Sequence, residues 1–362
     1  MKKFLSLALA LCLLLCGCGN GAEETTKTTT TAPVETTAAE TTTTESSTPT
    51  QTTEATLQYS NPLTGEALEE EYTGRPFGVM INNAKSALPQ CGIGQVDILY
   101  EVLAEGSVTR FMALFTDVSD AGPIGPVRSL RPYFLNVMRG YDALITSAGG
   151  SAEATEMVYN LDRDWMDGIN GTSGAYFYRD AWRRENRGYE HSLFIKGEDL
   201  LSGAQKLGMR TDDTEGWDYG LSFTDEVLKD GETAEKLVMH FYSGGKTTTM
   251  AYNADTGCYV GSQQGYALMD GNTEEVIPFR NVLVLLADTR SKDEVGHLEV
   301  QTTGEGTGWY ARDGKMIEIT WSREKEDASF RYFDADGEPL SLGVGKTYVA
   351  ILPKGDYKLD CE

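Results

Sequence analysis

Histidine and cysteine, the side chains that build most metal centres and disulfide frameworks, are scarce in this chain. It has three histidines and six cysteines in 362 residues. No CxxC pair and no cluster of Cys and His is present, so the usual zinc spacings are absent. A metal triad or a Ser-His-Asp relay would need His191, His240 and His297 to converge, and each alone is more often a surface or hydrogen-bonded residue. We therefore expect no metal site and no cofactor.

Basic residues are also few. The chain has 31 Lys and Arg against 55 Asp and Glu, which gives a net charge of −24. An acid excess of this size opposes binding to nucleic acid and to an anionic bilayer surface, and it keeps a protein soluble. We therefore exclude DNA and RNA as partners.

A long hydrophobic run is absent, but a short one opens the chain. Lys2 and Lys3 form a positive region, residues 4–15 an apolar core, and Leu15-Cys16-Gly17-Cys18 a small-residue cleavage site that ends in cysteine. The apolar core is too short to cross about 30 Å of hydrocarbon as a permanent span. The pattern predicts a lipoprotein signal peptide over residues 1–18. Cys18 would carry the lipid, such as palmitate, and hold the protein to the extracytoplasmic face of the cell membrane.

An ordinary secretory peptide with chance cysteines is the alternative to this interpretation. Cys16 is the weaker candidate for lipidation, because the bulky Leu14 and Leu15 precede it. Beyond Cys18, three cysteines remain: Cys91, Cys258 and Cys361. Three cysteines cannot all form disulfides with one another. Two arrangements remain: three isolated, mostly buried thiols, or one disulfide and one free thiol.

Residues 19–57 lack large apolar side chains and are rich in Thr. Such a segment cannot bury enough surface to offset its ordering entropy, so we expect a disordered linker between the membrane and the globular part. Thr-rich stalks of this composition are also acceptors for O-glycosylation.

Ordered structure is predicted from residue 58, and its character changes near residue 211. In 58–210, apolar runs alternate with segments of helical spacing. We predict strands over residues 76–82, 97–103, 109–116 and 142–146. We predict helices over residues 130–138, 151–159 and 197–207. In 211–362, short β-rich runs are separated by turn dipeptides such as Asp313-Gly314. We expect an α+β fold, with a mixed α/β N-terminal domain (58–210) and a mostly antiparallel β C-terminal domain (211–362).

Particular motifs in both halves resemble the YerB-type bacterial lipoproteins. They include Met80-Ile81-Asn82-Asn83, Asp97-Ile98-Leu99-Tyr100-Glu101, Thr109-Arg110-Phe111, Gly125-Pro126-Val127-Arg128-Ser129, Gly149-Gly150-Ser151 and the run 306–353. The resemblance spans nearly all of residues 60–353. It implies an envelope lipoprotein of Gram-positive type with an N-terminal and a C-terminal domain, and no established enzymatic activity. The segment 189–194 looks like the family's Pro-His-Asn-Leu-Tyr element, although Glu190 stands where proline is usual.

Polar residues gather at the ends of the predicted strands, and they form our candidate ligand-binding site. Arg128 and Arg131 stand at the opening of a predicted helix, where positive charge opposes the helix dipole. Either a bound anion or internal carboxylates such as Glu101 and Glu105 would explain them, and both remain open. The candidate residues, with His191 from the family element, are Asn82, Asn83, Glu101, Glu105, Arg110, Arg128, Ser129, Arg131, Ser151 and His191.

Three further patterns have a functional and a structural interpretation. Glu101 and Glu105 would share one face of a strand, roughly 13 Å apart, and paired carboxylates at ~5 to 9.5 Å are typical of glycoside hydrolases. Gly149-Gly150-Ser151 could cradle an anion, or form a tight turn with Ser151 as helix cap. The aromatic and basic run 176–184 suits sugar stacking, protein docking or core packing.

These observations favour a membrane-anchored lipoprotein that binds a cell-envelope ligand or partner protein through an Arg/Glu/Asn-lined site. The alternative is a peptidoglycan hydrolase that uses Glu101 or Glu105. A purely structural spacer is the third hypothesis.

Overall fold

An eleven-stranded sheet joins segments from both ends of the globular part. The computed structural model describes residues 59–294 and 296–362, so the predicted signal peptide, Cys18 and the predicted linker lie outside the described residues. Neighbouring strands follow the order β12-β22-β21-β18-β25-β4-β5-β3-β7-β8, and β23 pairs with β22. In that order they span Glu232–Thr233, Lys315–Arg323, Gly304–Arg312, Asn281–Ala287, Thr347–Pro353, Ile98–Glu105, Val108–Phe115, Phe77–Asn82, Leu144–Ser147 and Trp165–Asp167, with β23 at Arg331–Phe333.

Strand β25 makes this sheet continuous. It pairs in parallel with β18 on one side and with β4 on the other, although nearly the whole globular part separates β4 from β25 in the chain. Every residue of β18 and β25 is buried, as expected for strands with a neighbour on each side and cover on both faces. The domain boundary predicted at residue 210 therefore falls between segments whose strands share one sheet, and the boundary stays a prediction.

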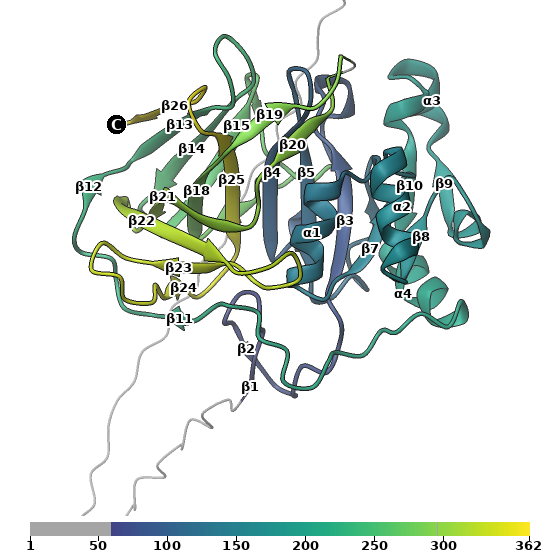
Figure 1. The fold of residues 1–362 in the computed structure, drawn as a ribbon, viewed down its shortest axis with the longest axis horizontal. Coiled ribbons are helices and arrows are strands. Elements are labelled where there is room, and N and C mark those ends of the chain that lie inside the picture. Colours follow the sequence, from purple (N-terminus) through teal and green to yellow (C-terminus); the bar gives the residue numbers. More distant parts are fainter. Residues whose placement is uncertain (1–58, 295) are drawn as a thin grey trace, which may run out of the picture. The chain divides into compact units, whose positions relative to one another are not determined.

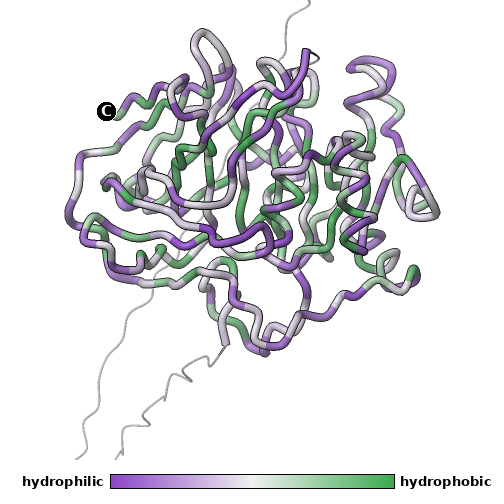
Figure 2. The backbone as a smooth tube through the Cα atoms, viewed as in Figure 1, coloured by the Kyte–Doolittle hydropathy of each residue, from purple (hydrophilic) through white to green (hydrophobic). Residues whose placement is uncertain are grey.

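A second, six-stranded antiparallel sheet covers one face of the first. Its order is β16-β15-β14-β13-β26, and β17 also pairs with β15. The strands span Tyr266–Ala267, Cys258–Gln263, Thr247–Asn253, Lys236–His240, Lys358–Cys361 and, for β17, Pro278–Phe279. Leu237, Met239 and Met250 from this sheet pack with Val79, Leu99 and Val284 from the large one, in a single hydrophobic core. The hydrophobic colouring in Figure 2 follows these inner strands, whereas the outer loops are mostly hydrophilic.

Helices α1 and α2 cover the opposite face of the large sheet (Figure 1). Helix α1 (Pro132–Gly140) begins with proline at its first turn, where the missing N–H costs nothing. Helix α2 (Ala152–Asn160) begins after Ser151. Tyr133 and Phe134 of α1 pack with Tyr100 of β4 and Leu283 of β18 in a second core. Helices α3 (Ala181–Asn186) and α4 (Gly197–Lys206) lie further along, beside the small sheet β6-β10-β9.

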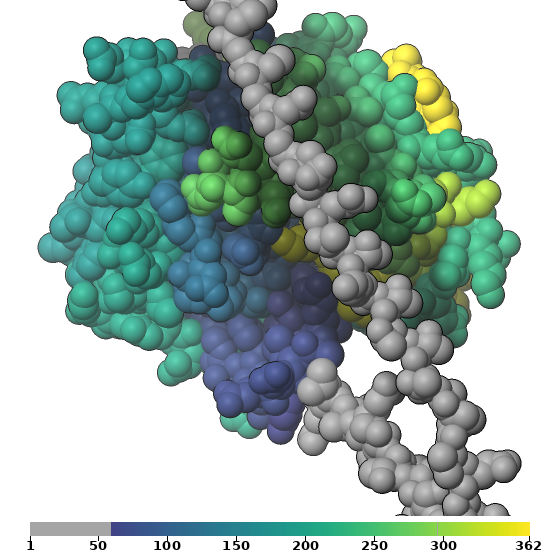
Figure 3. All heavy atoms as spheres, turned by 180° about the vertical axis from the view of Figure 1, so that it is seen from behind, coloured from purple at the N-terminus to yellow at the C-terminus, as the bar shows by residue number. Residues whose placement is uncertain are grey.

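The remaining elements are short. The strands are β6 Pro123–Ile124, β9 Phe177–Arg179, β10 Leu193–Lys196, β1 Tyr59–Ser60 with β2 Ala67–Leu68, β11 Phe223–Thr224 with β24 Leu342–Gly343, and β19 Thr289–Ser291 with β20 Leu298–Val300. Four 3₁₀ turns span Lys85–Ala87, Ile93–Gln95, Thr172–Tyr176 and Tyr189–His191. Seen from behind, blue to teal residues fill most of one side of the body, and a small green group lies against them (Figure 3).

The predicted α+β class is confirmed. Helices occur only in the first half of the described chain, and the second half is mostly antiparallel sheet. The strands predicted at 76–82, 97–103 and 109–116 correspond to β3, β4 and β5. Helix α3 was not predicted, and neither were the strands β1, β2, β6, β8, β9, β10, β11, β12, β17, β19, β24 and β26. No helix in the described part of the chain combines the length and apolar character that a membrane span requires.

Candidate functional site

Glu101, a predicted ligand-binding residue, lies inside the protein. It is fully buried between the two sheets. Its carboxylate accepts hydrogen bonds from Asn83 Nδ2 (2.9 Å), Thr109 Oγ1 (2.6 Å), Thr248 Oγ1 (2.9 Å) and the Tyr348 hydroxyl. These donors come from both sheets, so Glu101 holds the two sheets together. The ligand-binding role predicted for Asn83 and Glu101 does not fit this geometry, because neither side chain is accessible.

Glu105 lies on the other face of the same hairpin. The register of β4 and β5 shifts between Leu103 and Glu105, and this bulge breaks the strict alternation of side chains. The Glu105 carboxylate consequently pairs with Arg110 (2.9 Å), whose neighbour Thr109 points the opposite way toward Glu101. The expectation that Glu101 and Glu105 share a face is therefore wrong. Two carboxylates on opposite faces of a sheet do not form the pair that the hydrolase hypothesis needs.

Glu105 joins two predicted arginines in a network at the start of α1. Arg131, the residue before α1, forms an ion pair with Glu105. Arg110 is 3% exposed and also donates to the Ser129 carbonyl oxygen (2.6 Å). Burial lowers the pKa of Arg110 to about 10. Of the two explanations for positive charge at this helix N-terminus, internal carboxylates apply, since Glu105 neutralises Arg131.

The Gly149-Gly150-Ser151 turn is also satisfied internally. Ser151 Oγ accepts the Ala154 N–H (3.2 Å), which is the helix cap expected for this residue. The Gly149 N–H donates to the Asp167 carboxylate (2.8 Å). The site that an external anion would use is thus occupied by a side chain of β8.

Arg128, Asn82 and His191 lie closer to the surface. Arg128 Nη2 is 3.1 Å from the Glu190 carboxylate, and its side chain is 26% exposed. His191 Nδ1 is 2.8 Å from Asn82 Nδ2, so in this geometry the ring nitrogen accepts the hydrogen bond. Partial burial, together with the positive Arg128, lowers the pKa of His191. The family element around His191 is thereby attached to the end of β3.

The other histidines and the cysteines do not assemble into a site. His240 is 3.2 Å from Asp360, and His297 Nδ1 is 2.6 Å from Asp293, on separate elements. Cys91, Cys258 and Cys361 are all free thiols, and burial raises the pKa of Cys91. Within 59–294 and 296–362, no three His, Cys, Asp or Glu side chains are grouped closely enough to hold a metal ion.

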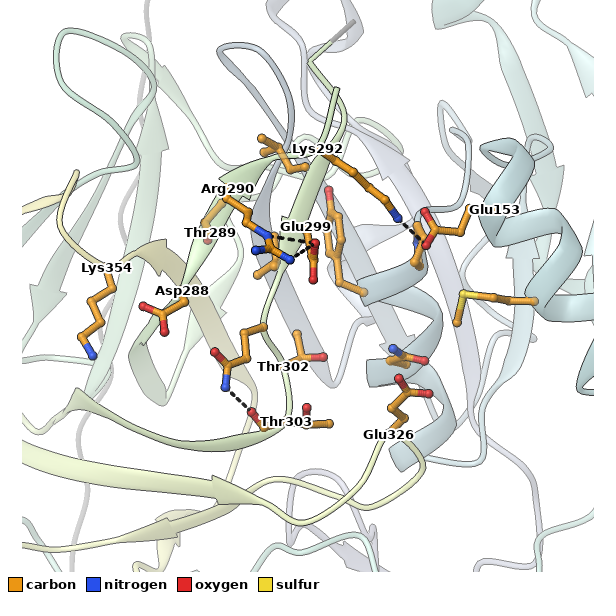
Figure 4. Close-up of a pocket in the computed structure, with 17 residues that line it drawn as sticks. Glu153, Asp288, Thr289, Arg290, Lys292, Glu299, Thr302, Thr303, Glu326 and Lys354 are labelled. Carbon is orange, nitrogen blue, oxygen red and sulfur yellow. Dashed lines mark hydrogen bonds and ion pairs between the residues drawn. The ribbon is translucent and has the colours of Figure 1, made fainter. Parts of the chain in front are cut away.

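A pocket of about 660 Å³ opens where the two halves of the chain meet (Figure 4). One wall is formed by α1 and α2, and the other by the β19–β20 hairpin and the segment after it. Ion pairs link Lys292 to Glu153 (2.6 Å) across the pocket and Arg290 to Glu299 (2.8 Å) within the hairpin. The lining residues are Pro132, Tyr133, Asn136, Glu153, Met157, Asp288, Thr289, Arg290, Lys292, Leu298, Glu299, Val300, Gln301, Thr302, Thr303, Glu326 and Lys354.

Two of the predicted site residues, Glu105 and Arg131, lie beside this pocket at the start of α1 rather than in its lining. Tyr133, in the pocket wall, lies two residues after Arg131 and donates its hydroxyl hydrogen to the Leu103 carbonyl oxygen (2.7 Å). The Glu105 network therefore fixes the start of α1 against the β4–β5 hairpin. None of the ten predicted site residues lines the pocket itself.

Two lining side chains are available to a ligand. Asp288 and Lys354 have no hydrogen-bond or ion-pair partner for their charged groups among the described residues. Figure 4 shows both on the same side of the pocket. Neither residue stands out in the sequence, because isolated charged residues in turns, far from α1 in the chain, show no periodic or motif signal.

The fold and site define a class of protein in which one sheet joins two halves and a polar pocket lies at their junction. A family model described as "Protein of unknown function (DUF3048) N-terminal domain" matches residues 63–210, and its C-terminal counterpart matches residues 237–349. The chain belongs to this YerB-type family, as its motifs indicated.

A curated relative and a solved structure both support membership of this family. The chain is 28% identical over 299 residues to "Putative lipoprotein YerB" of Bacillus subtilis (strain 168), which covers 82% of this chain and 86% of the relative. The crystal structure of YerB from Bacillus subtilis matches with a TM-score of 0.70 and 25% identity, over 83% of this chain and 99% of that one.

Proposed function

We propose that the chain is a lipid-anchored protein of the extracytoplasmic membrane face that binds a polar cell-envelope ligand in the pocket between α1, α2 and the β19–β20 hairpin. The lipid anchor is supported by the cysteine-terminated leader and by the lipoprotein name of the relative. The observation that carries the binding role is the pocket at the junction of the two halves.

The size and chemistry of the pocket favour a small polar ligand. About 660 Å³ lies within the range of ordinary small-molecule sites, roughly 300 to 1,000 Å³, which often occur where two parts of a protein meet. Unlike most such sites, this one is lined largely by charged and hydroxyl side chains, so an apolar ligand would leave them unpaired. An available carboxylate at Asp288 and ammonium at Lys354 suit a ligand with both an amine and a carboxylate, such as a peptidoglycan stem peptide.

Binding is tested with muropeptides released from purified peptidoglycan, titrated calorimetrically into the full chain in detergent. Asp288→Asn and Lys354→Gln should each weaken binding about tenfold, because each removes one charge-assisted hydrogen bond. The control Asp255→Asn with Lys229→Gln makes the same charge changes at exposed sites elsewhere and should bind as the unaltered protein does. Equal affinities for all variants would exclude the pocket.

Anchoring is tested separately by metabolic labelling with palmitate and by cell fractionation. We expect label in the membrane fraction and none after Cys18→Ala. Label that persists in Cys18→Ala, or a protein found with the cytosol, would refute the anchor.

A further inference from the structure

The segment from β9 to the 3₁₀ turn at Tyr189–His191 contains arginines that no carboxylate neutralises. Every other arginine among the described residues, except Arg323, has an Asp or Glu oxygen within 4.0 Å. Arg179, Arg183, Arg184 and Arg187 have no such partner there. In a chain with a net charge of −24, acidic groups are abundant, so this local absence of pairing is unusual.

Exposed aromatic rings lie among these arginines. Trp182 is 59% exposed and Tyr189 57%. The Arg179 guanidinium lies 3.5 Å from the centre of the Tyr189 ring, and Arg187 lies 5.6 Å from that of Trp182. Arg184 is also exposed, and it lies 5.6 Å from the Tyr189 ring. We call Arg179, Trp182, Arg184, Arg187 and Tyr189 the Arg–aromatic surface.

This surface is fixed to the body. Arg183, on the inner side of α3, donates to the Ala87 carbonyl oxygen (2.8 Å) and to that of Pro89 (2.6 Å). The Asp180 carboxylate caps α3 by accepting the Arg183 N–H (2.7 Å). Arg184 and Arg187, in contrast, make no side-chain hydrogen bond among the described residues, so their donors are free for a ligand.

We propose that the Arg–aromatic surface binds a phosphodiester polymer with a sugar or polyol backbone. Guanidinium groups match phosphate oxygens geometrically, and flat exposed rings provide contact for the C–H faces of sugars and polyols. Across residues 177–191 and Arg128, five arginines stand against Asp180, Glu185 and Glu190, so the surface is locally positive on an acidic protein. The surrounding acidity repels the polymer from other faces, which restricts it to this one.

The short length of α3 favours such a polymer over the bilayer. A helix that lies in a membrane interface needs a broad apolar face, whereas α3 has six residues and Trp182 is its one large apolar side chain.

The test measures binding of fluorescent poly(glycerol phosphate) to the full chain in nonionic detergent, where no anchoring is needed. We expect salt-dependent binding that Arg184→Gln with Arg187→Gln weakens about tenfold or more, with the slope of log K against log salt reduced by about 2. Trp182→Ala should weaken binding several-fold. The control Lys325→Gln with Arg331→Gln removes the same charge from exposed residues elsewhere and should change affinity less than about twofold.

Three results would overturn the proposal: no binding of the polymer, an equal loss of affinity in the control variant, or equal binding of neutral dextran.

A fourth result that would overturn the proposal is contact of the surface with the membrane. The full chain is reconstituted in vesicles of phosphatidylcholine and phosphatidylglycerol that contain brominated lipid. Fluorescence quenching that disappears in Trp182→Phe would show that α3 contacts the bilayer. Failure of muropeptide binding in the pocket leaves all these measurements unaffected, so the two proposals fail independently.

Discussion

Arg323 offers the strongest single test of how the two halves are held together. It is fully buried, and it has no carboxylate partner within the described residues. Its guanidinium donates to carbonyl oxygens of Ala328 (2.7 Å), Thr302 (3.1 Å), Glu326 (2.5 Å) and Asn136 in α1. Burial lowers the pKa of this guanidinium to about 10.

Replacement of Arg323 by Met keeps the volume but removes every donor. Each buried acceptor left unpaired costs about 1–3 kcal/mol, and relief from burying a charge offsets part of that sum. We expect a loss of about 3–5 kcal/mol in the free energy of unfolding. Arg323→Lys should cost less, because it retains a charge that reaches some of the same oxygens. Asn136, Thr302 and Glu326, whose carbonyl oxygens Arg323 contacts, also line the pocket. The Arg323→Met variant should therefore lose ligand affinity as well as stability.

The measurement is urea unfolding of the full chain in detergent, followed by tryptophan fluorescence, with thermal unfolding beside it. The melting temperature changes by about 2 °C or more for each kcal/mol of lost stability. We therefore expect Arg323→Met to melt at least about 6 °C below the unaltered protein. Arg331→Met is the matched control: this arginine is exposed and pairs with Asp218 at the surface, so its loss should cost below about 1 kcal/mol. If both variants lose the same free energy of unfolding, the hydrogen bonds from Arg323 to these carbonyl oxygens do not stabilise the junction.

Three other predictions concern local structure. Ser151→Ala removes the acceptor for the Ala154 N–H and should lower the free energy of unfolding by about 1 kcal/mol; an unchanged urea midpoint would contradict the cap. Gly197→Ala places a Cβ 1.7 Å from the Val118 carbonyl oxygen and should cost about 1–3 kcal/mol or more, so a variant of normal melting temperature would refute the close contact. Burial raises the pKa of Asp97 from 3.8 to about 6, so the folded state binds its proton more tightly than the unfolded state. Its contribution to stability is full below about pH 4 and is lost as pH rises through 6, and Asp97→Asn should remove that part of the pH dependence.

Local patterns predicted most elements near the site. The periodicity of 76–82, 97–103 and 109–116 located β3, β4 and β5, and the serine before 152–160 located the start of α2. These features depend on neighbours within a few residues, so alternation and capping chemistry suffice to find them. The candidate site was predicted less well. Glu101 and Glu105 looked equivalent, but one bulged residue put them on opposite faces.

The amino-acid sequence by itself determined the α+β class, the separate characters of the two halves and, through its motifs, the family. Tertiary structure decided that β25 lies between β18 and β4, that Glu101 joins two sheets, and that a pocket forms beside α1. Strand pairing between distant segments depends on the total surface buried and the hydrogen bonds completed when the whole chain is folded. No local spacing records that balance.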